Sequence, residues 1–305
     1  MIYPDNFEQK IGFNEIRNML RERCLSTLGK EQVEKMAFSD DAEQVNEWLK
    51  QVREFRRLIL EVEDFPLQYF YDVRESIVRI RIENTHLEEN ELFDLRRSLS
   101  TIDCIVKILN HSDEDESHAE ENDGWRREKK YTYPSLHLLA KDIVTFPQIV
   151  QRIDQILDKF GKIRDNATPE LLQIRRELAK TEGSISRTLY GILRAAQSEG
   201  VVEKDVTPTL RDGRLVIPVI PTLKKKIKGI VHDESATGKT VFIEPTEVVE
   251  ANNRVRELEG EERKEIIRIL TQFTNKLRPY TREIMDSCRF LAKIDLIQAK
   301  QKLAE

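Results

Sequence analysis

Two long stretches of helical periodicity enclose a short block rich in β-branched residues, and this order constrains the fold most strongly. From Leu171 to Ala196, apolar residues keep a near-heptad spacing after the helix-start sequence Thr168-Pro169-Glu170. The second stretch begins at Glu247 and reaches Pro279. Because helices of similar length flank the block, the simplest geometry is an antiparallel pair that carries the block at its tip.

The enclosed block, residues 201–245, is expected to form a small antiparallel sheet. Three runs in it have the composition of strands: Arg214–Ile220, Lys225–His232 and Lys239–Ile243. Before the first of them, the sequence Arg211-Asp212-Gly213-Arg214 predicts a tight turn. The block therefore differs in fold class from the helices on either side of it.

Within the block, Gly238-Lys239-Thr240 resembles the end of a phosphate-binding P-loop, but its context predicts a different structure. A P-loop needs glycine five residues before Gly238, where this chain has Asp233, whose carboxylate would repel a phosphate. A P-loop also continues into a helix, whereas β-branched and aromatic residues follow Lys239. We therefore predict a β-hairpin with its turn at residues 236–239, and no nucleotide site.

The rest of the chain is expected to be a helical body. Helical periodicity covers residues 7–110, 134–160 and 281–305. Residues 111–133, acidic and then basic, predict a surface loop. His111 and His118 lie among its carboxylates and could hold a metal ion weakly, but they match no known ligand spacing, so a solvated loop is the prediction.

The expected fold class is mainly α with a small antiparallel β unit. Five segments follow from the patterns: a helical core (1–168), a first long helix (169–200), the β unit (201–245), a second long helix (246–279) and a return to the core (280–305).

Composition sets limits on location and partners. The 305 residues are 34% charged with a net charge of −5, which favours long exposed helices and argues against a uniformly basic coat. No apolar run is long enough to span a membrane and no signal peptide is recognisable, so a cytoplasmic location is expected. Cys24, Cys104 and Cys288 lie in apolar helical patterns and are expected to be reduced core residues.

No catalytic set stands out in the sequence. His232, Asp233 and Ser235 are close neighbours, but hydrogen bonding within a turn explains Asp233 and Ser235 better than catalysis does. No spacing of cysteines and histidines indicates a zinc site. The residues of this chain therefore predict neither a catalytic site nor a zinc site.

The β unit is locally basic although the chain is acidic. Residues 211–228 hold six basic residues and one acidic residue, a local charge of +5. The candidate phosphate-binding residues are Arg211, Arg214, Lys224, Lys225, Lys226, Lys228 and Lys239. A basic edge suits a phosphate backbone, which is bound without sequence readout. Lysines that protect a sheet edge from aggregation would give the same pattern, and both interpretations stay open.

Four motifs follow one another along the chain: GKIRDNATPEL at 161–171, RDGRLVIPV at 211–219, HDESATGKTVFIEP at 232–245 and NNRVREL at 252–258. Together they resemble the bacterial type-two MutS family, the recombination-suppressing paralogues of mismatch-repair MutS proteins. The resemblance implies that the helical body is the core domain, that the long helices are levers, and that the β unit is a clamp. It also implies an ATPase domain, with ATP and Mg²⁺, and a small nuclease domain after residue 305, so this chain is expected to be a fragment with neither enzymatic activity nor cofactor.

The resemblance further implies a partner. The clamp would contact the phosphates of branched or duplex DNA, and the full-length protein would act as a homodimer that suppresses homologous recombination. The same family is linked to collided ribosomes, so binding to ribosomal RNA or protein is the alternative. The expected location is the bacterial cytoplasm, with the nucleoid or with ribosomes. A third hypothesis is an enzyme in its own right, which ATP binding that depends on Lys239 would support. The fallback is an interaction scaffold in which the long helices act only as a spacer.

Overall fold

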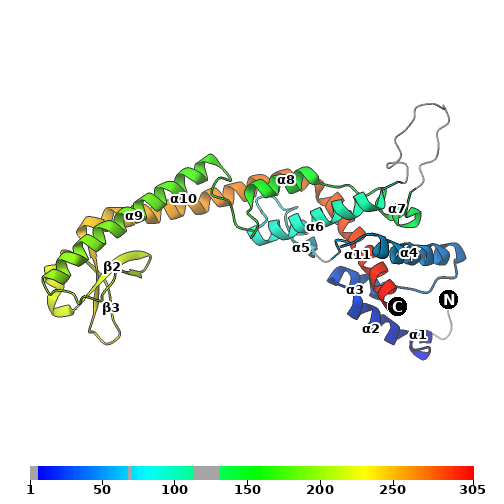
Figure 1. Ribbon diagram of the computed structural model, residues 1–305, viewed down its shortest axis with the longest axis horizontal. Coiled ribbons are helices and arrows are strands. Elements are labelled where there is room, and N and C mark those ends of the chain that lie inside the picture. The colour runs from blue at the N-terminus through cyan, green and yellow to red at the C-terminus, as the bar shows by residue number, and fades with distance from the viewer. Residues whose placement is uncertain (1–5, 68–70, 113–130) are drawn as a thin grey trace. The chain divides into compact units, whose positions relative to one another are not determined.

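The computed structural model describes residues 6–67, 71–112 and 131–305, and the chain divides into two compact units (Figure 1). Unit 1 comprises residues 1–162 and 270–305, and unit 2 comprises residues 163–269. Helices with one small antiparallel sheet confirm the expected fold class. Most of the predicted loop at 111–133, including His118, lies outside the described residues.

The described part of unit 1 consists of helices and their connecting segments, with an isolated β-bridge between Ser112 and Tyr131. Its helices are α1 (Phe7–Lys10), α2 (Phe13–Arg23), α3 (Thr27–Glu34), α4 (Ala42–Glu61), α5 (Arg74–Arg79), α6 (Glu89–Leu109), α7 (Pro134–Ala140), α8 (Pro147–Ile156) and α11 (Thr281–Ala304). The end of α10 (Thr246–Leu277) and the short 3-10 helix η3 (Arg278–Tyr280) lead into α11. The predicted helix at 134–160 is thus two helices, separated at residues 141–146.

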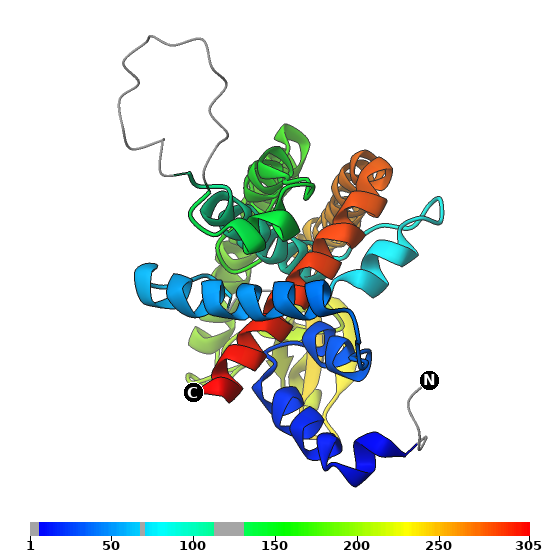
Figure 2. The same ribbon diagram turned by 90° about the vertical axis from the view of Figure 1, so that its right-hand side faces the viewer.

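Helix α11 forms the centre of unit 1, with α2, α3, α4 and α5 packed against it (Figure 2). Its buried side chains include Ile284, Leu291 and Ile294, each without exposed surface. Burying apolar side chains of this size stabilises a fold by about 1.5–3 kcal/mol each. Twelve residues of α11 are buried, so this helix contributes more to the core of unit 1 than its polar composition suggests.

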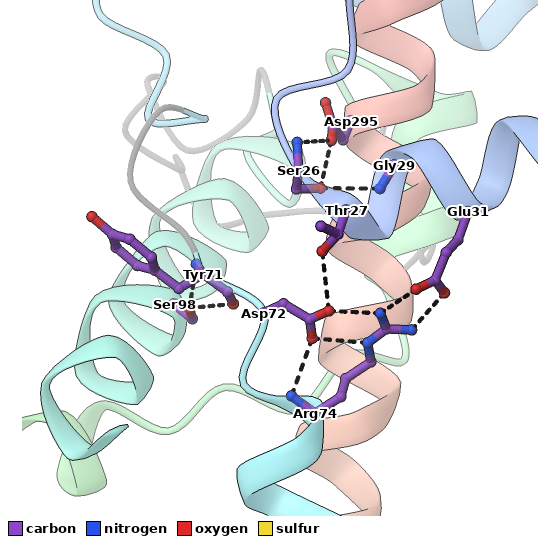
Figure 3. A network of polar contacts seen from close by, with 9 residues as sticks. All are labelled: Ser26, Thr27, Gly29, Glu31, Tyr71, Asp72, Arg74, Ser98 and Asp295. Carbon is purple, nitrogen blue, oxygen red and sulfur yellow. Dashed lines mark hydrogen bonds and ion pairs between the residues drawn. The ribbon is translucent and has the colours of Figure 1, made fainter. Parts of the chain in front are cut away.

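A buried carboxylate fixes α3 to α11. Asp295 on α11 has no exposed surface, and its two oxygens accept hydrogen bonds from the backbone amides of Leu25 and Ser26, each at 2.9 Å. Figure 3 shows the contacts of Asp295 with Ser26. The Ser26 hydroxyl donates to the same carboxylate at 2.6 Å and accepts from the amide of Gly29 at 3.0 Å, which caps α3. The start of α3 is therefore held by a residue 269 positions away in sequence.

A second polar cluster joins α3 to α5. Arg74 donates to Glu31 at 2.6 and 2.7 Å and to Asp72 at 2.6 and 2.8 Å, and Thr27 donates to Asp72 at 3.1 Å (Figure 3). The hydrogen bonds from Arg74 lower the pKa of both carboxyl groups. These charge-assisted contacts orient α5 against the α3 end of the core.

In unit 2, α9 (Pro169–Ser198) and the first part of α10 run antiparallel. Thr168 caps α9 by accepting from the amide of Leu171 at 3.1 Å, and its hydroxyl donates to Glu265 at 2.7 Å. Further along, Arg175 pairs with Glu262 at 2.7 Å. Because the partner numbers on α10 fall as those on α9 rise, the two helices run in opposite directions, as the sequence predicts.

Four short strands complete unit 2. The strands are β1 (Thr209–Arg211), β2 (Arg214–Val219), β3 (Gly229–Glu234) and β4 (Val241–Pro245), arranged in the order β1-β2-β4-β3 with every neighbouring pair antiparallel. Apolar residues of β2 and β4, such as Ile217 and Ile243, pack with Leu189 of α9 and Val248 of α10. The sheet therefore shares one core with the C-terminal half of α9 and the start of α10 (Figure 1).

Two predictions for the sheet need correction. The strand expected from Lys225 starts only at Gly229, because Pro221–Lys226 form a 3-10 helix, η2, after Pro221 fixes its first turn. Strand β1 was not predicted. It pairs with β2 through the expected tight turn, in which Asp212 and Gly213 both have positive φ, at 46° and 71°.

Two predictions for the helical core are also partly wrong. Cys24 and Cys288 are buried, but Cys104 is exposed, since it lies about 200° around α6 from the buried Ile102. The helical pattern expected from residue 7 places Ile11, Ile16, Met19, Leu20 and Cys24 in one apolar stripe. Of these five, Leu20 and Cys24 are buried, while the other three are exposed. Helix α2 is buried on the side that meets α3 and α11, and this side is narrower than the stripe.

Candidate nucleic-acid interface

The Gly238-Lys239-Thr240 sequence lies in a β-hairpin, as predicted. Strands β3 and β4 flank it, and the amide of Ser235 donates to the carbonyl of Thr240 at 2.8 Å. Gly238 has φ of +68°, the left-handed conformation that glycine adopts readily in turns. Neither a helix N-terminus nor a loop of main-chain amides follows Lys239, so this stretch does not fit the β- and γ-phosphates of a nucleotide.

Behind the hairpin lies a buried carboxylate that sequence analysis missed. Glu244 on β4 has no exposed surface, and three side chains from three other elements converge on it. Arg214 of β2 donates at 2.7 Å, Asn252 of α10 at 2.7 Å, and His232 of β3 lies with its Nε2 at 2.5 Å. This cluster, here called the Glu244 cluster, joins the sheet to α10.

The cluster keeps its carboxylate ionised. Burial raises the pKa of Glu244, but hydrogen bonds from Asn252, His232 and Arg214, together with the positive charge of Arg214, outweigh burial and leave the pKa below its usual value. A buried charge is tolerated only when it is paired in this way. The sequence carries no local signal for the cluster, because its members are up to 38 positions apart.

The predicted lysines lie in the segments on either side of strand β3. Lys224, Lys225 and Lys226 end the 3-10 helix η2, and Lys228 directly precedes β3. All four side chains are exposed, as is Lys239 in the hairpin turn. Within the part of the chain that the structure describes, none of the five forms an ion pair.

The two predicted arginines lie in different surroundings. Arg211, at the end of β1, is exposed at 45% of its side chain, with its guanidinium 4.2 Å from the centre of the Phe242 ring and 3.6 Å from Asp233. Arg214 is only 14% exposed and belongs to the Glu244 cluster, where Asn253 also accepts a hydrogen bond from it at 2.6 Å. The structure thus brings Arg211 to the surface and turns Arg214 inward.

The polar residues of the hairpin make turn contacts rather than a catalytic set. Ser235 accepts from the amide of Thr240 at 3.0 Å and Asp233 accepts from the amide of Glu234 at 2.8 Å, as predicted for them. Among the described residues, His, Cys, Asp and Glu side chains form no group of three that could hold a metal ion. None of the described helices has the length and apolar character to cross a membrane.

Comparison with known proteins agrees with the resemblance in the sequence. Over 292 residues, 96% of this chain, the sequence is 32% identical to Endonuclease MutS2 of a Geobacillus species and 34% identical to Endonuclease MutS2 of Levilactobacillus brevis. The chain is MutS2-like. A third relative, Endonuclease MutS2 of Thermomicrobium roseum, is 32% identical over the same share of the chain. No protein-family model matches.

The MutS2-like chain spans about a third of the length of these relatives, since the matches cover 35% of each of the three. The word endonuclease in the relatives' names describes those longer proteins. The motifs quoted from the sequence include the start of α9, the β1–β2 turn, the β3–β4 hairpin and part of α10, so the similarity includes the basic sheet of unit 2.

Proposed function

We propose that unit 2 binds nucleic acid through the phosphate backbone, and that the protein acts on branched or duplex DNA without reading its sequence. Exposed ammonium groups that lack ion pairs among the described residues carry this proposal: Lys224, Lys225, Lys226, Lys228 and Lys239. Such groups gain affinity by releasing counterions condensed on the nucleic acid. Suppression of homologous recombination is the biological role that this binding would serve.

The position of these lysines favours phosphate binding over protection of a sheet edge. Lys228 precedes the edge strand β3 and suits either role. Lys224, Lys225 and Lys226 belong to the 3-10 helix η2, which pairs with no strand among the described residues, so they protect no edge. Three successive charges there are better explained by an anionic partner.

Arg211 and Arg214 enter the proposal with different roles. Arg211 is 45% exposed, and its guanidinium lies over the ring of Phe242, so the exposed N–H groups can pair with a phosphate while the ring contacts the guanidinium. Arg214 is satisfied by Glu244 and Asn253. We propose that Arg214 keeps the sheet in place and contributes to binding only indirectly.

A salt titration tests the proposal. Binding of a labelled four-way DNA junction would be followed by fluorescence anisotropy between low and physiological salt, for the unchanged chain and for a triple variant with Lys224→Glu, Lys225→Glu and Lys226→Glu. We expect the triple variant to bind more weakly, and the slope of log affinity against log salt to fall by about one for each phosphate that the variant no longer neutralises.

The matched control reverses three exposed lysines of unit 1: Lys30→Glu, Lys50→Glu and Lys141→Glu. It changes the net charge by the same amount, so equal weakening in both variants would mean that only the total charge matters. Affinity that is independent of salt, or unchanged in the Lys224–Lys226 variant, would refute the proposal.

Properties of the full-length protein are proposed on the resemblance alone. ATP and Mg²⁺ would bind in a region of the longer protein outside the matched third, and dimerisation would bring two clamps around one DNA. Binding of the same variants to stalled ribosomes tests the alternative partner, because it can be compared with their binding to junction DNA. Tighter, lysine-dependent binding to ribosomes than to junction DNA would replace DNA as the target.

A further inference from the structure

A pocket of about 470 Å³ opens on unit 1, far in sequence from the basic sheet. It lies between α4, α7, α11 and the segment that joins α3 to α4. Its apolar walls are formed by Met36, Phe38, Trp48, Leu139, Leu296 and Ile297. Sites for organic ligands usually enclose about 300–1,000 Å³ and have mostly apolar walls with a few polar groups, so this pocket has the dimensions of a binding site.

The charged groups of the pocket are all positive. Lys35, Lys293 and Lys300 line it, and its lining contains neither aspartate nor glutamate, in a chain whose net charge is −5. None of the three lysines forms an ion pair with a residue that the structure describes. Three ammonium groups collected around apolar walls repel one another, and a bound anion would relieve that repulsion.

Lys300 and Trp48 show how the apolar and charged parts combine. The Lys300 ammonium lies 5.7 Å from the centre of the Trp48 ring, a cation–π distance. Burial lowers the pKa of Lys300, since no carboxylate among the described residues compensates for its reduced hydration. Trp48 is nevertheless 38% exposed and Phe38 is 59% exposed, so two large aromatic rings face the opening with surface still to bury.

We propose that this pocket docks an acidic segment of a partner protein. A bulky apolar side chain of the segment would pack against Trp48 and Phe38, and neighbouring carboxylates would pair with the ammonium groups of Lys35, Lys293 and Lys300. Aromatic residues in a pocket, surrounded by charges of one sign, have the composition of an interface centre that gains its affinity from burial and its partner choice from charge.

A nucleotide fits the pocket less well than a peptide. Phosphates are usually held by free main-chain amides at a helix start. The nearest helix start is that of α4, where the Asp41 carboxylate already accepts from the amides of Glu43 and Gln44 at 3.0 and 3.1 Å. Gln44 lines the pocket, so a phosphate there would meet an occupied amide and a negative charge.

Fluorescence of Trp48 provides a direct test. The chain has two tryptophans, so Trp125→Phe leaves Trp48 as the single reporter. The probe is a short synthetic peptide with phenylalanine and leucine at its centre and glutamates on both sides, and its control has glutamines in place of the glutamates. We expect a saturable change in Trp48 fluorescence with the acidic peptide, weaker binding as salt rises, and no saturation with the control peptide.

Charge reversal at Lys35 and Lys293, the exposed lysines at the rim of the pocket, then tests whether the peptide binds there. Lys35 and Lys293 are exposed, so Lys35→Glu with Lys293→Glu is expected to leave the fold intact and to weaken peptide binding at least about tenfold. Lys30→Glu with Lys141→Glu, at exposed positions outside the pocket, should change binding little. Absence of saturation at millimolar peptide, equal affinity in the rim variant, or tighter binding of ATP than of the peptide would overturn the proposal.

Discussion

The carboxylate of Glu244 and the amide of Asn252 meet at 2.7 Å in the interior of unit 2, one on β4 and the other on α10. Because Arg214 and His232 contact the same carboxylate, Glu244→Ala would remove one hydrogen-bond partner from each of three side chains, Arg214, His232 and Asn252. We expect the free energy of unfolding, measured by urea denaturation, to fall by about 3 kcal/mol. Glu234→Ala, at an exposed position of β3, should change stability by less than about 0.5 kcal/mol.

The same carboxylate predicts a pH dependence with a definite sign. The pKa of Glu244 is below the usual value of 4.5 in the folded chain, so its stabilising contribution is complete above about pH 4.5 and disappears as the pH falls through the lower folded value. The difference in unfolding free energy between the unchanged chain and Glu244→Gln should therefore shrink as the pH falls below about 4.5. A difference that grows on acidification would contradict the assignment.

Gly229 at the start of β3 has no room for a side chain. A Cβ atom there would overlap the carbonyl oxygen of Glu244, which is main chain and cannot move alone. Gly229→Ala should destabilise the chain by about 1–3 kcal/mol. Gly183→Ala is the matched control: it lies inside α9 with open space around it and should stabilise the chain by about 0.5–1 kcal/mol. Calorimetric melting curves of the two variants should shift in opposite directions.

The three cysteines should differ sharply in reactivity. Cys104 is exposed, whereas burial raises the pKa of both Cys24 and Cys288 to about 12. Since the thiolate is the reactive form, a disulfide reagent at about pH 8 should modify one thiol quickly and the other two only after denaturant is added. Mass spectrometry after the fast phase should find the label on Cys104, and rapid labelling of Cys288 would show that α11 is not buried as described.

Local signals in the sequence were sufficient to predict helix ends and turns, because at these positions one or two residues determine the backbone conformation. Thr168 and Pro169 begin α9, Gly200 with φ of +70° follows its end, and Asp212-Gly213 makes the two-residue turn. Each of these residues acts within a few positions, so a single sequence reveals it. The exposed lysines of the β unit were predicted for the same reason, because a run of basic residues can be recognised in the sequence alone.

Interactions across the fold could not be predicted from the sequence. Glu244 looked like an ordinary strand residue before Pro245, and nothing near it indicated that Arg214 and Asn252 would bury it. Asp295 likewise stands in an amphipathic helix, while the amides that it binds belong to Leu25 and Ser26. Helical spacing also overestimates burial when the apolar side of a helix is broader than the surface that packs against neighbouring helices. On α4, Trp48 belongs to the apolar side but stays partly exposed and lines a pocket.

The 3-10 geometry of η2 gives its three lysines separate directions. Three residues complete one turn of such a helix, so the side chains of Lys224, Lys225 and Lys226 leave its axis about 120° apart. A straight rod-like polyanion approaching from one direction can therefore meet some of them and not others. Reversing them singly should weaken binding to three unequal degrees, and their ranking would reveal the side from which the ligand arrives.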